Sequence, residues 1–357
     1  MLKIIDRYII RKFLTTFFFM MGVIMLLAVI FDLSERLQEF IENKAPFKAI
    51  VLDYYVNFIF FYGNMFSALI IFISVIWFTA KMAQNTEIIP MLNSGRPFHR
   101  FLRPYMIGAT LLTLMSLAMN HFILPSANAK RLGFEEEFYR FSLSVSNYHA
   151  DFPNGESVYF KNYKSDQGYI QDFYMEKWSE DNKLEYFLSA KRLRPTGDKT
   201  WTLEDYFLRK VGQTGDEIVH GDKMDTTFAF GIDEFARRDN IVETMDYEEL
   251  NNFIEREKQK GNENVPAFEL VKHQRTSYPF ASYVLTLIGV AVSSRKSRGG
   301  IGVHIATGLA FVFIYIFAMQ VTSVAAINIG FPTLLASWIP NLVFGVIGLV
   351  LYRLAPK

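Results

Sequence analysis

Few side chains in this sequence of 357 residues have the types and spacing that catalysis needs. The six histidines are scattered without the close spacing of a metal site, and the chain has no cysteine. No nucleophile elbow or zinc-protease helix pattern is present. The acidic runs 135–137 and 248–249 are most simply explained as solvated helix faces. We therefore expect no metal and no catalytic site.

A nucleotide-binding loop is also missing from the sequence. The nearest fragment, 196–200, lacks the glycine spacing that a phosphate cradle needs, so the chain cannot hydrolyse ATP by that route. The 37 basic residues nearly balance 36 acidic ones, and this balance argues against nucleic-acid binding.

Uncharged apolar runs long enough to cross the hydrocarbon layer define the fold class. They form two clusters of three, namely 13–31, 54–80 and 104–124, then 277–294, 301–330 and 333–352. We predict a polytopic α-helical membrane protein with six spans, arranged as a first half 1–124, an inserted soluble domain 125–276 and a second half 277–357. Ion-driven transporters carry ionisable groups within their spans, and these runs have only His121 and His304 near their ends. Any transport work is therefore expected to be powered by another chain.

The charge of the loops predicts the orientation. One side of the six spans carries 13 basic residues and only two acidic ones, Asp6 and Glu87, whereas the other side carries 24 basic and 34 acidic residues. The basic side, with both termini, is expected in the cytoplasm, and the inserted domain on the outer side of the membrane.

The inserted domain shows turn signals about every dozen residues, which is typical of short antiparallel strands. The segments between them, 157–163, 169–178, 184–193 and 201–211, are rich in aromatic and β-branched residues. We predict an all-β sandwich or jelly roll, followed by one helix over 247–260. Asp246 and Glu249 form a capping-box pattern for that helix, and Gly261 stands at its stop position.

The order of these parts and several local motifs resemble the LptF/LptG family of lipopolysaccharide export permeases over essentially the whole chain. The most specific stretch is 78–95, FTAKMAQNTEIIPMLNSG, where the family has an acidic residue, a short helix and Ser-Gly. Further matches are 6–13, 103–105, Pro125, 275–279 and the basic loop 295–300. The family's usual proline in the second span is missing from 60–66 here, which leaves a bend there without its usual cause.

The resemblance implies a β-jelly-roll domain in the periplasm and a location in the bacterial inner membrane. It also implies a second permease of the same type, a cytoplasmic ATPase dimer that uses ATP, and periplasmic jelly-roll bridge proteins that receive lipopolysaccharide. The chain itself would need no cofactor. The main alternative is a membrane scaffold that transports nothing and recruits envelope partners through its jelly roll. An enzyme acting on envelope lipids is the weakest alternative.

The resemblance also suggests where the ATPase docks. A coupling segment at about 83–97 would use Glu87, the lone acid on a basic surface, with apolar contact area around it. The predicted coupling residues are Glu87, Ile88, Ile89, Met91, Leu92, Gly95 and Arg96. The simpler alternative is a short interfacial loop in which Glu87 pairs with Lys81 or Arg96. Pro90 falls inside this helix, where it is tolerated only in the first turn.

Two further sets of residues have proposed roles. Five cations near the outer ends of the spans could contact lipid head groups, or could be ordinary interfacial anchors: Arg36, Lys44, Lys130, Arg131 and Arg275. In the fifth span, Gly302, Ala306 and Ala310 repeat at four-residue intervals and form a small-residue face. This face could pack within the chain, and the resemblance favours pairing with the partner permease.

Overall fold

The structure, a computed structural model of the chain, describes most of the sequence. The described residues are 3–93, 97–139, 144–152, 154–165, 167–179, 181, 183–212, 215–232, 239–294 and 300–355. They form two compact units, a helical unit of residues 1–132 and 266–357, and a β unit of residues 133–265.

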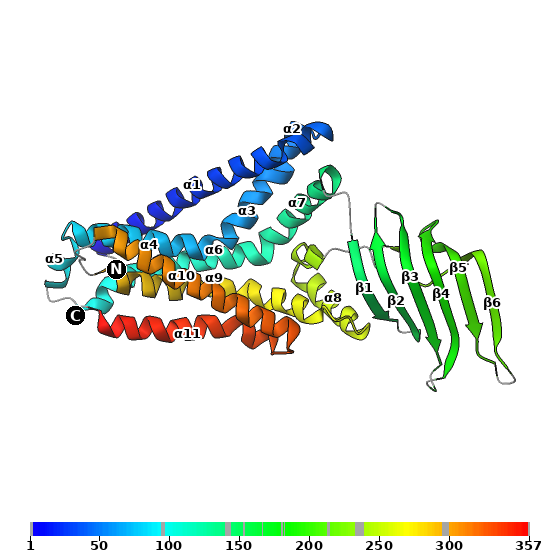
Figure 1. Cartoon of the computed structure of the whole chain (residues 1–357). Coiled ribbons are helices and arrows are strands. Elements are labelled where there is room, and N and C mark those ends of the chain that lie inside the picture. The colour runs from blue at the N-terminus through cyan, green and yellow to red at the C-terminus, as the bar shows by residue number, and fades with distance from the viewer. Residues whose placement is uncertain are drawn as a thin grey trace. The chain divides into compact units, whose positions relative to one another are not determined.

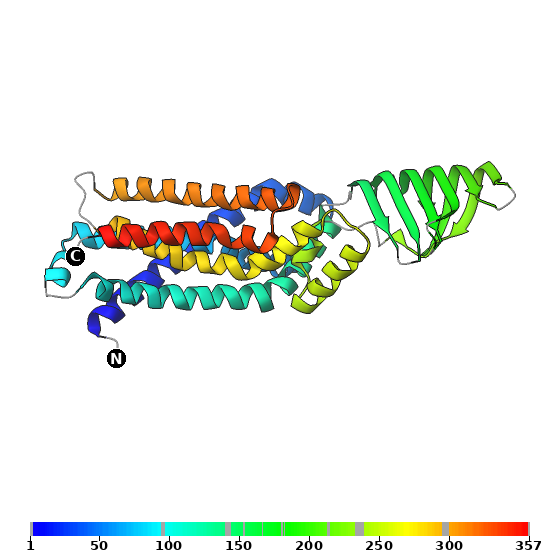
Figure 2. The same cartoon turned by 90° about the horizontal axis from the view of Figure 1, so that it is seen from below.

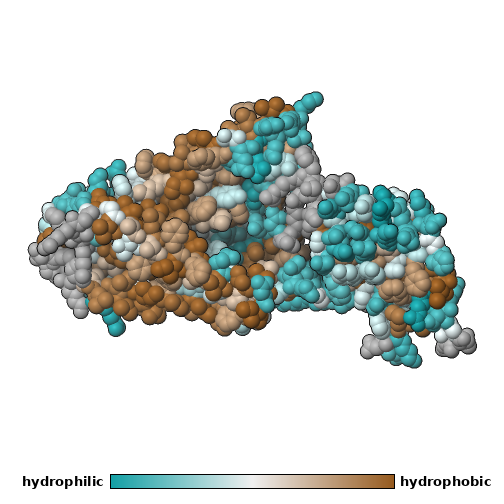
Figure 3. Space-filling view, in the orientation of Figure 1, coloured by the Kyte–Doolittle hydropathy of each residue, from teal (hydrophilic) through white to brown (hydrophobic). Residues whose placement is uncertain are grey.

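Six described helices are long and apolar enough to cross a membrane, which confirms the six-span prediction (Figure 1). They are α1 (Ile4–Glu42), α4 (Ser67–Gln84), α6 (Phe98–Ala118) with its continuation to Phe138, α9 (Val265–Ser293), α10 (Gly300–Asn328) and α11 (Thr333–Leu354). Apolar side chains cover much of the visible face of this unit, as expected for a surface that faces lipid (Figure 3).

Both chain termini and the short helix α5 (Ile88–Asn93) lie at the same end of the helical unit, whereas α2 (Phe47–Ala49) lies at the other end (Figures 1 and 2). This arrangement is the one that six alternating spans require, because an even number of crossings returns the chain to its starting side.

The second span is broken even though it contains no proline. After the π-helical turn Ile50–Tyr55, α3 (Val56–Met65) ends before Phe66, and α4 starts at Ser67. Figure 1 shows α3 tilted away from α4. Next to the break, the Asn64 side chain accepts a hydrogen bond from Ser116 Oγ and donates one to Asn120 Oδ1, both at 2.7 Å. The bend expected in the family is therefore present without its usual residue.

The third span also continues further than the sequence indicates. A π-helical turn, Met119–Ile123, joins α6 to α7 (Leu124–Phe138), and Pro125 is the second residue of α7. Pro125 has no N–H to donate to the preceding turn, and the change from π-helical to α-helical geometry falls directly before it. The proline that seemed to end the span therefore lies inside a continuous helical segment.

Side chains on neighbouring spans donate to backbone carbonyls of α9, and one of these carbonyls is released by a proline. Pro279 in α9 cannot bond the carbonyl of Arg275 one turn earlier, and Asn120 Nδ2 donates to that carbonyl at 3.0 Å. Asn341 of α11 donates to the Ser277 carbonyl and accepts a hydrogen bond from Tyr315 of α10, both at 2.8 Å. Because hydrocarbon offers no partners, these bonds hold the spans in one register.

The first turns of α1 pack tightly into the helical unit. Ile9, Phe13 and Phe17 are fully buried in a cluster with residues of α4, α5 and α6. Gly108 of α6 makes this possible, since a Cβ atom there would lie 2.5 Å from Cδ1 of Phe13. Beyond Phe17, much of the apolar surface of α1 is exposed, and only 17% of its most apolar window is buried.

The β unit contains a six-stranded antiparallel sheet with its strands in sequence order, which confirms the inserted all-β, jelly-roll-like domain. The strands are β1 (Ser144–Asp151), β2 (Glu156–Lys164), β3 (Tyr169–Trp178), β4 (Leu184–Pro195), β5 (Thr200–Lys210) and β6 (Glu217–Thr227). One face of the sheet is apolar, and Phe228 and Phe230 after β6 pack on it. Trp201 Nε1 donates to the Phe230 carbonyl at 3.2 Å and so holds the segment after β6 on this face.

A bend crosses the sheet along a single line. Asn147, Asp172 and Asp205, on alternate strands, have φ values of 53°, 52° and 55°, and each lies between the same two rows of paired residues. Asn and Asp tolerate this left-handed backbone better than other residues with a side chain. The alternation of buried and exposed side chains consequently shifts by one residue there. Phe160 and Tyr163 of β2 both face the core, although they are three residues apart.

Helix α8 (Tyr247–Gln259) confirms the predicted capping box. The Glu249 N–H donates to Asp246 Oδ1 at 2.8 Å, and the Asp246 N–H donates to Glu249 Oε2 at 3.1 Å. Gly261 follows the helix with φ of 67°, as the stop signal requires. Leu250 and Ile254 are buried, whereas Tyr247 is exposed.

The contact between Phe13 and Gly108 can be tested by substitution. Gly108→Ala should lower the thermal stability of the purified protein, by about 1–3 kcal/mol, because the added methyl group must displace a fully buried ring. Gly22→Ala is the matched control, because its Cβ would meet nothing within 4 Å. Thermal melting of both variants in detergent checks the prediction, and equal melting temperatures would contradict it.

Candidate functional site

Glu87 stands directly after the end of α4, where the backbone turns sharply. The N–H groups of Thr86 and Glu87 donate to the carbonyls of Ala83 and Met82, at 3.1 and 2.9 Å. This pair of bonds is a Schellman motif, with Thr86 at the left-handed position where glycine is usual. Thr86 has φ of 58°, a costly conformation for a β-branched residue. The two hydrogen bonds hold Thr86 in this conformation and fix the direction in which the chain leaves α4.

The Glu87 carboxylate is half-buried and is held by neutral donors. Tyr8 Oη donates to Oε2 at 3.0 Å, and Asn85 Nδ2 donates to Oε1 at 3.2 Å. The sequence alternative paired Glu87 with Lys81 or Arg96. The structure places Tyr8 and Asn85 on the carboxylate instead, and Arg96 lies outside the described residues. Lys12 Nζ in turn donates to Tyr8 Oη at 2.6 Å and lies 4.8 Å from the centre of the Tyr8 ring.

The residues of α5 divide between the core and the surface. Ile88 is 2% exposed and packs in the cluster of Phe13, so it anchors the segment and offers no contact area. Ile89 is 48% exposed, and Met91 is partly buried against the same cluster. Pro90 is the third residue of α5 and thus lies in its first turn. The Leu92 side chain, Gly95 and Arg96 lie outside the described residues.

The second acid at this end of the helical unit, Asp6, is buried. Its Oδ2 atom lies 2.8 Å from Nη2 of Arg100 at the start of α6 and accepts a hydrogen bond from the N–H of Lys3 at 2.9 Å. The two acids thus connect the first turns of α1 to α6 and to the segment after α4. Sequence analysis assigned no partner to Tyr8, Asp6 or Arg100. The only local signal was the i,i+4 spacing of Tyr8 and Lys12.

The five candidate cations fall into different environments. Arg36 lies 3.3 Å from Glu39 and 3.8 Å from Glu35, so nearby acids already offset its charge. Lys44 is exposed after α1, with φ of 52°, and Lys130 is exposed on α7. Arg131 and Arg275 are buried, and the Arg131 guanidinium stacks 4.5 Å from the centre of the Phe61 ring. The structure therefore does not gather these five cations into one surface.

The small-residue face of α10 is uncovered in this chain. Gly302, Ala306 and Ala310 are exposed, and a Cβ atom at Gly302 would meet nothing within 4 Å. Contact with α4 uses another face of α10, where a Cβ atom at Gly308 would lie 2.2 Å from Cδ1 of Ile76. The intrachain alternative for the small-residue face therefore finds no support among the described contacts.

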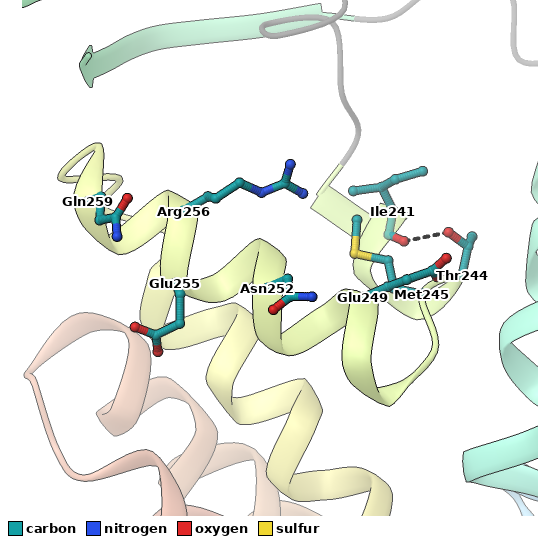
Figure 4. A pocket seen from close by; sticks show the side chains of 8 residues that line it. All are labelled: Ile241, Thr244, Met245, Glu249, Asn252, Glu255, Arg256 and Gln259. Carbon is teal, nitrogen blue, oxygen red and sulfur yellow. Dashed lines mark hydrogen bonds between the residues drawn. The ribbon is translucent and has the colours of Figure 1, made fainter. Parts of the chain in front are cut away.

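An open pocket in the β unit runs along α8 (Figure 4). Its lining residues are Ile241, Thr244, Met245, Glu249, Asn252, Glu255, Arg256 and Gln259. Glu255 and Arg256 point in different directions, and Thr244 donates to the Ile241 carbonyl at 2.7 Å. The described residues contain no group of three or more side chains that could hold a metal ion. The pocket thus has no converging set of acid, base or metal-binding groups.

Six helices long and apolar enough to span a membrane, with an all-β domain inserted between the third and fourth, define a polytopic α-helical membrane protein. Residues 7–354 match the family model of the lipopolysaccharide export system permease LptF/LptG. The chain therefore belongs to the LptF/LptG family of lipopolysaccharide export permeases, and it is a transporter membrane subunit. A search of curated proteins found no match.

The pair of Asp6 and Arg100 can be tested by Asp6→Asn. Asparagine keeps an acceptor for the Lys3 N–H but loses the charge that faces Arg100, so we expect a loss of about 2 kcal/mol in stability. Thermal melting of Asp6→Asn, Arg100→Gln and the double variant checks this expectation. If the losses of stability from the two single variants add fully in the double variant, the two residues do not interact directly.

Proposed function

We propose that the chain is one of two permease subunits of an ATP-driven exporter, which extracts lipopolysaccharide from the inner membrane and passes it to a periplasmic bridge. Besides the family, one observation carries this proposal. A half-buried carboxylate, Glu87, stands at the unit's end that holds both termini, next to the exposed side chain of Ile89. A basic, apolar-lined groove on a cytoplasmic ATPase dimer would fit these features.

The proposed orientation puts this end of the unit in the cytoplasm and the β unit in the periplasm. The excess of basic residues in the loops on the side of the termini supports it. ATP would be bound and hydrolysed by the partner ATPase, because this sequence has no phosphate-binding loop.

The second permease would pack against α1 and α10. These two spans are the least buried of the six, with 17% and 22% of their most apolar windows buried, compared with 67% for α4. The uncovered face of Gly302, Ala306 and Ala310 would allow a helix of the partner to approach closely. A lipid cavity would then lie between the two permeases.

Lipopolysaccharide carries phosphate groups on sugars above several acyl chains. Exposed Lys44 and Lys130 near the outer ends of the spans are suited to contact the phosphates, and Arg36 could do so while it remains balanced by acids. Acyl chains would pass through the apolar interior of the β unit and from there to the jelly-roll bridge proteins.

Purification of the chain from its native membrane tests the proposal. We expect a second six-span permease, a nucleotide-binding subunit and lipopolysaccharide to co-purify, and mass spectrometry would identify each of them. Recovery of the wild-type chain with neither an ATPase nor a glycolipid would contradict the exporter and favour a scaffold.

Substitution of Glu87 tests the docking site. Glu87→Lys places a cation where a basic groove would bind, so we expect a tenfold or greater loss of co-purified ATPase and of lipopolysaccharide release. Glu255→Lys, the same change of charge on α8, is the matched control. Equal recovery of the ATPase with both variants would show that docking does not use Glu87.

Replacement of Ala306 tests the pairing face. Ala306→Phe should abolish co-purification of the second permease while the chain keeps its melting temperature, because this side chain faces outward. Ala306→Gly keeps a small residue and should pair normally. Normal pairing of Ala306→Phe would contradict the role of this face.

A further inference from the structure

The hydrogen bonds around Glu87 connect it to α1 as well as to α4. The segment that would receive the ATPase is therefore joined directly to the first span. This inference rests on the proposed docking at Glu87 and concerns how the docking is organised and transmitted.

The direction of the hydrogen bonds can be derived from the chemistry of the groups. A charged lysine can only donate, so Tyr8 Oη must accept from Lys12 Nζ at 2.6 Å. A carboxylate can only accept, so the Tyr8 hydroxyl proton must point to Glu87 Oε2 at 3.0 Å. The two hydrogen bonds therefore run in one direction, from Lys12 to Tyr8 and from Tyr8 to Glu87. Both bonds involve a charged group, which strengthens them.

Apolar packing beneath Glu87 also connects the coupling segment to α1. Ile88 follows Glu87 directly and is buried in one cluster with Ile9 and Phe13 of α1. Asp6, one turn from Ile9, is bound to Arg100 of α6. Two kinds of contact thus attach the first turns of α1 to the segment around Glu87. One is the hydrogen bond of Tyr8 at the surface, and the other is the apolar packing of Ile88 beneath it.

The rest of α1 is attached differently. Its outer half contacts the start of the second span, where Tyr54 Oη donates to Asp32 at 3.1 Å and the Tyr54 ring lies 5.8 Å from that of Phe40. The second span is broken at Phe66, between α3 and α4. A displacement of this packed end could therefore carry the outer half of α1 together with α3, because the break at Phe66 separates α3 from α4.

We propose that Tyr8 is a positioning residue that orients the Glu87 carboxylate for the partner ATPase and joins it to α1, so that α1 moves with the coupling segment. Tyr8 donates to Oε2 of Glu87, and Asn85 donates to Oε1 over a longer distance, 3.2 Å. Oε1 is therefore the oxygen that would bind a cation of the partner ATPase. The hydroxyl group of Tyr8 carries this function, and its ring does not.

The test uses the assembled complex of permeases and ATPase, with Tyr8→Phe, Glu87→Gln and the double variant. We measure the affinity for the ATPase subunit, ATP turnover, and lipopolysaccharide released per ATP. Tyr8→Phe should weaken the affinity about three- to tenfold, the net effect of one typical exposed hydrogen bond, and should lower the release per ATP. The double variant should be no worse than Glu87→Gln, because both changes remove the same contact.

Tyr352→Phe is the matched control, since it removes a hydroxyl from a ring that packs on Phe98 at the same end of the unit. Its affinity and release should equal those of the wild type. Melting temperatures of Tyr8→Phe and the wild type should agree within about 2 °C, because an exposed hydroxyl contributes little to global stability.

Two results would overturn the inference. If Tyr8→Phe behaves as wild type while Glu87→Gln binds the ATPase poorly, docking at Glu87 stands but Tyr8 does not position it. If the losses from Tyr8→Phe and Glu87→Gln multiply in the double variant, the two residues act separately. Wild-type behaviour of all three variants would instead contradict docking at Glu87 itself.

Discussion

The close contact between Phe13 and Gly108 is the interaction on which the packing around Glu87 and the first turns of α1 depends. A glycine in α6 lets a phenylalanine ring of α1 reach the centre of a cluster that also contains residues of α4 and α5. The first turns of α1, the end of α4, the coupling segment and the first half of α6 therefore form one packed body at the end that holds the termini. A force applied to Glu87 would reach α1 through contacts of this body, without passing through the remaining spans.

The other spans pack in a second apolar cluster, and hydrogen bonds between them add to that packing. Within hydrocarbon, water cannot satisfy the Arg275 carbonyl that Pro279 releases, so a side-chain amide on a neighbouring span takes that role. Asn120 and Asn341 both donate to carbonyls of α9, which connects the third and the sixth span to the fourth. These bonds favour a rigid centre. The outer half of α1 makes contact mainly through Tyr54 and Phe40, beside a second span that is broken at Phe66.

Much of this architecture follows from the sequence, because it depends on local patterns. Span-length apolar runs, spaced turn signals and the pair Asp246 and Glu249 each predict an element from adjacent residues. Other features depend on contacts between distant residues. Tyr8 and Glu87 are 79 positions apart, and Asp6 and Arg100 are 94 apart, so no sequence pattern indicates either pair. Ile88 and Ile89 have the same apolar character, and only the packing of α1 decides which one is buried. The bend at Phe66 has no local signal in the sequence. The polar side chain beside it, Asn64, forms hydrogen bonds with distant residues of the third span.

The claim that the ATPase moves α1 can be measured directly, because a chain without cysteine accepts spin labels only at engineered positions. Labels at Leu37 on α1 and Leu334 on α11, both exposed near the outer ends of their spans, report the distance between the two helices. We expect this distance to change when a non-hydrolysable nucleotide is added to the assembled complex, and we expect Tyr8→Phe to reduce the change. A distance that stays constant with nucleotide in the active wild-type complex would contradict the account.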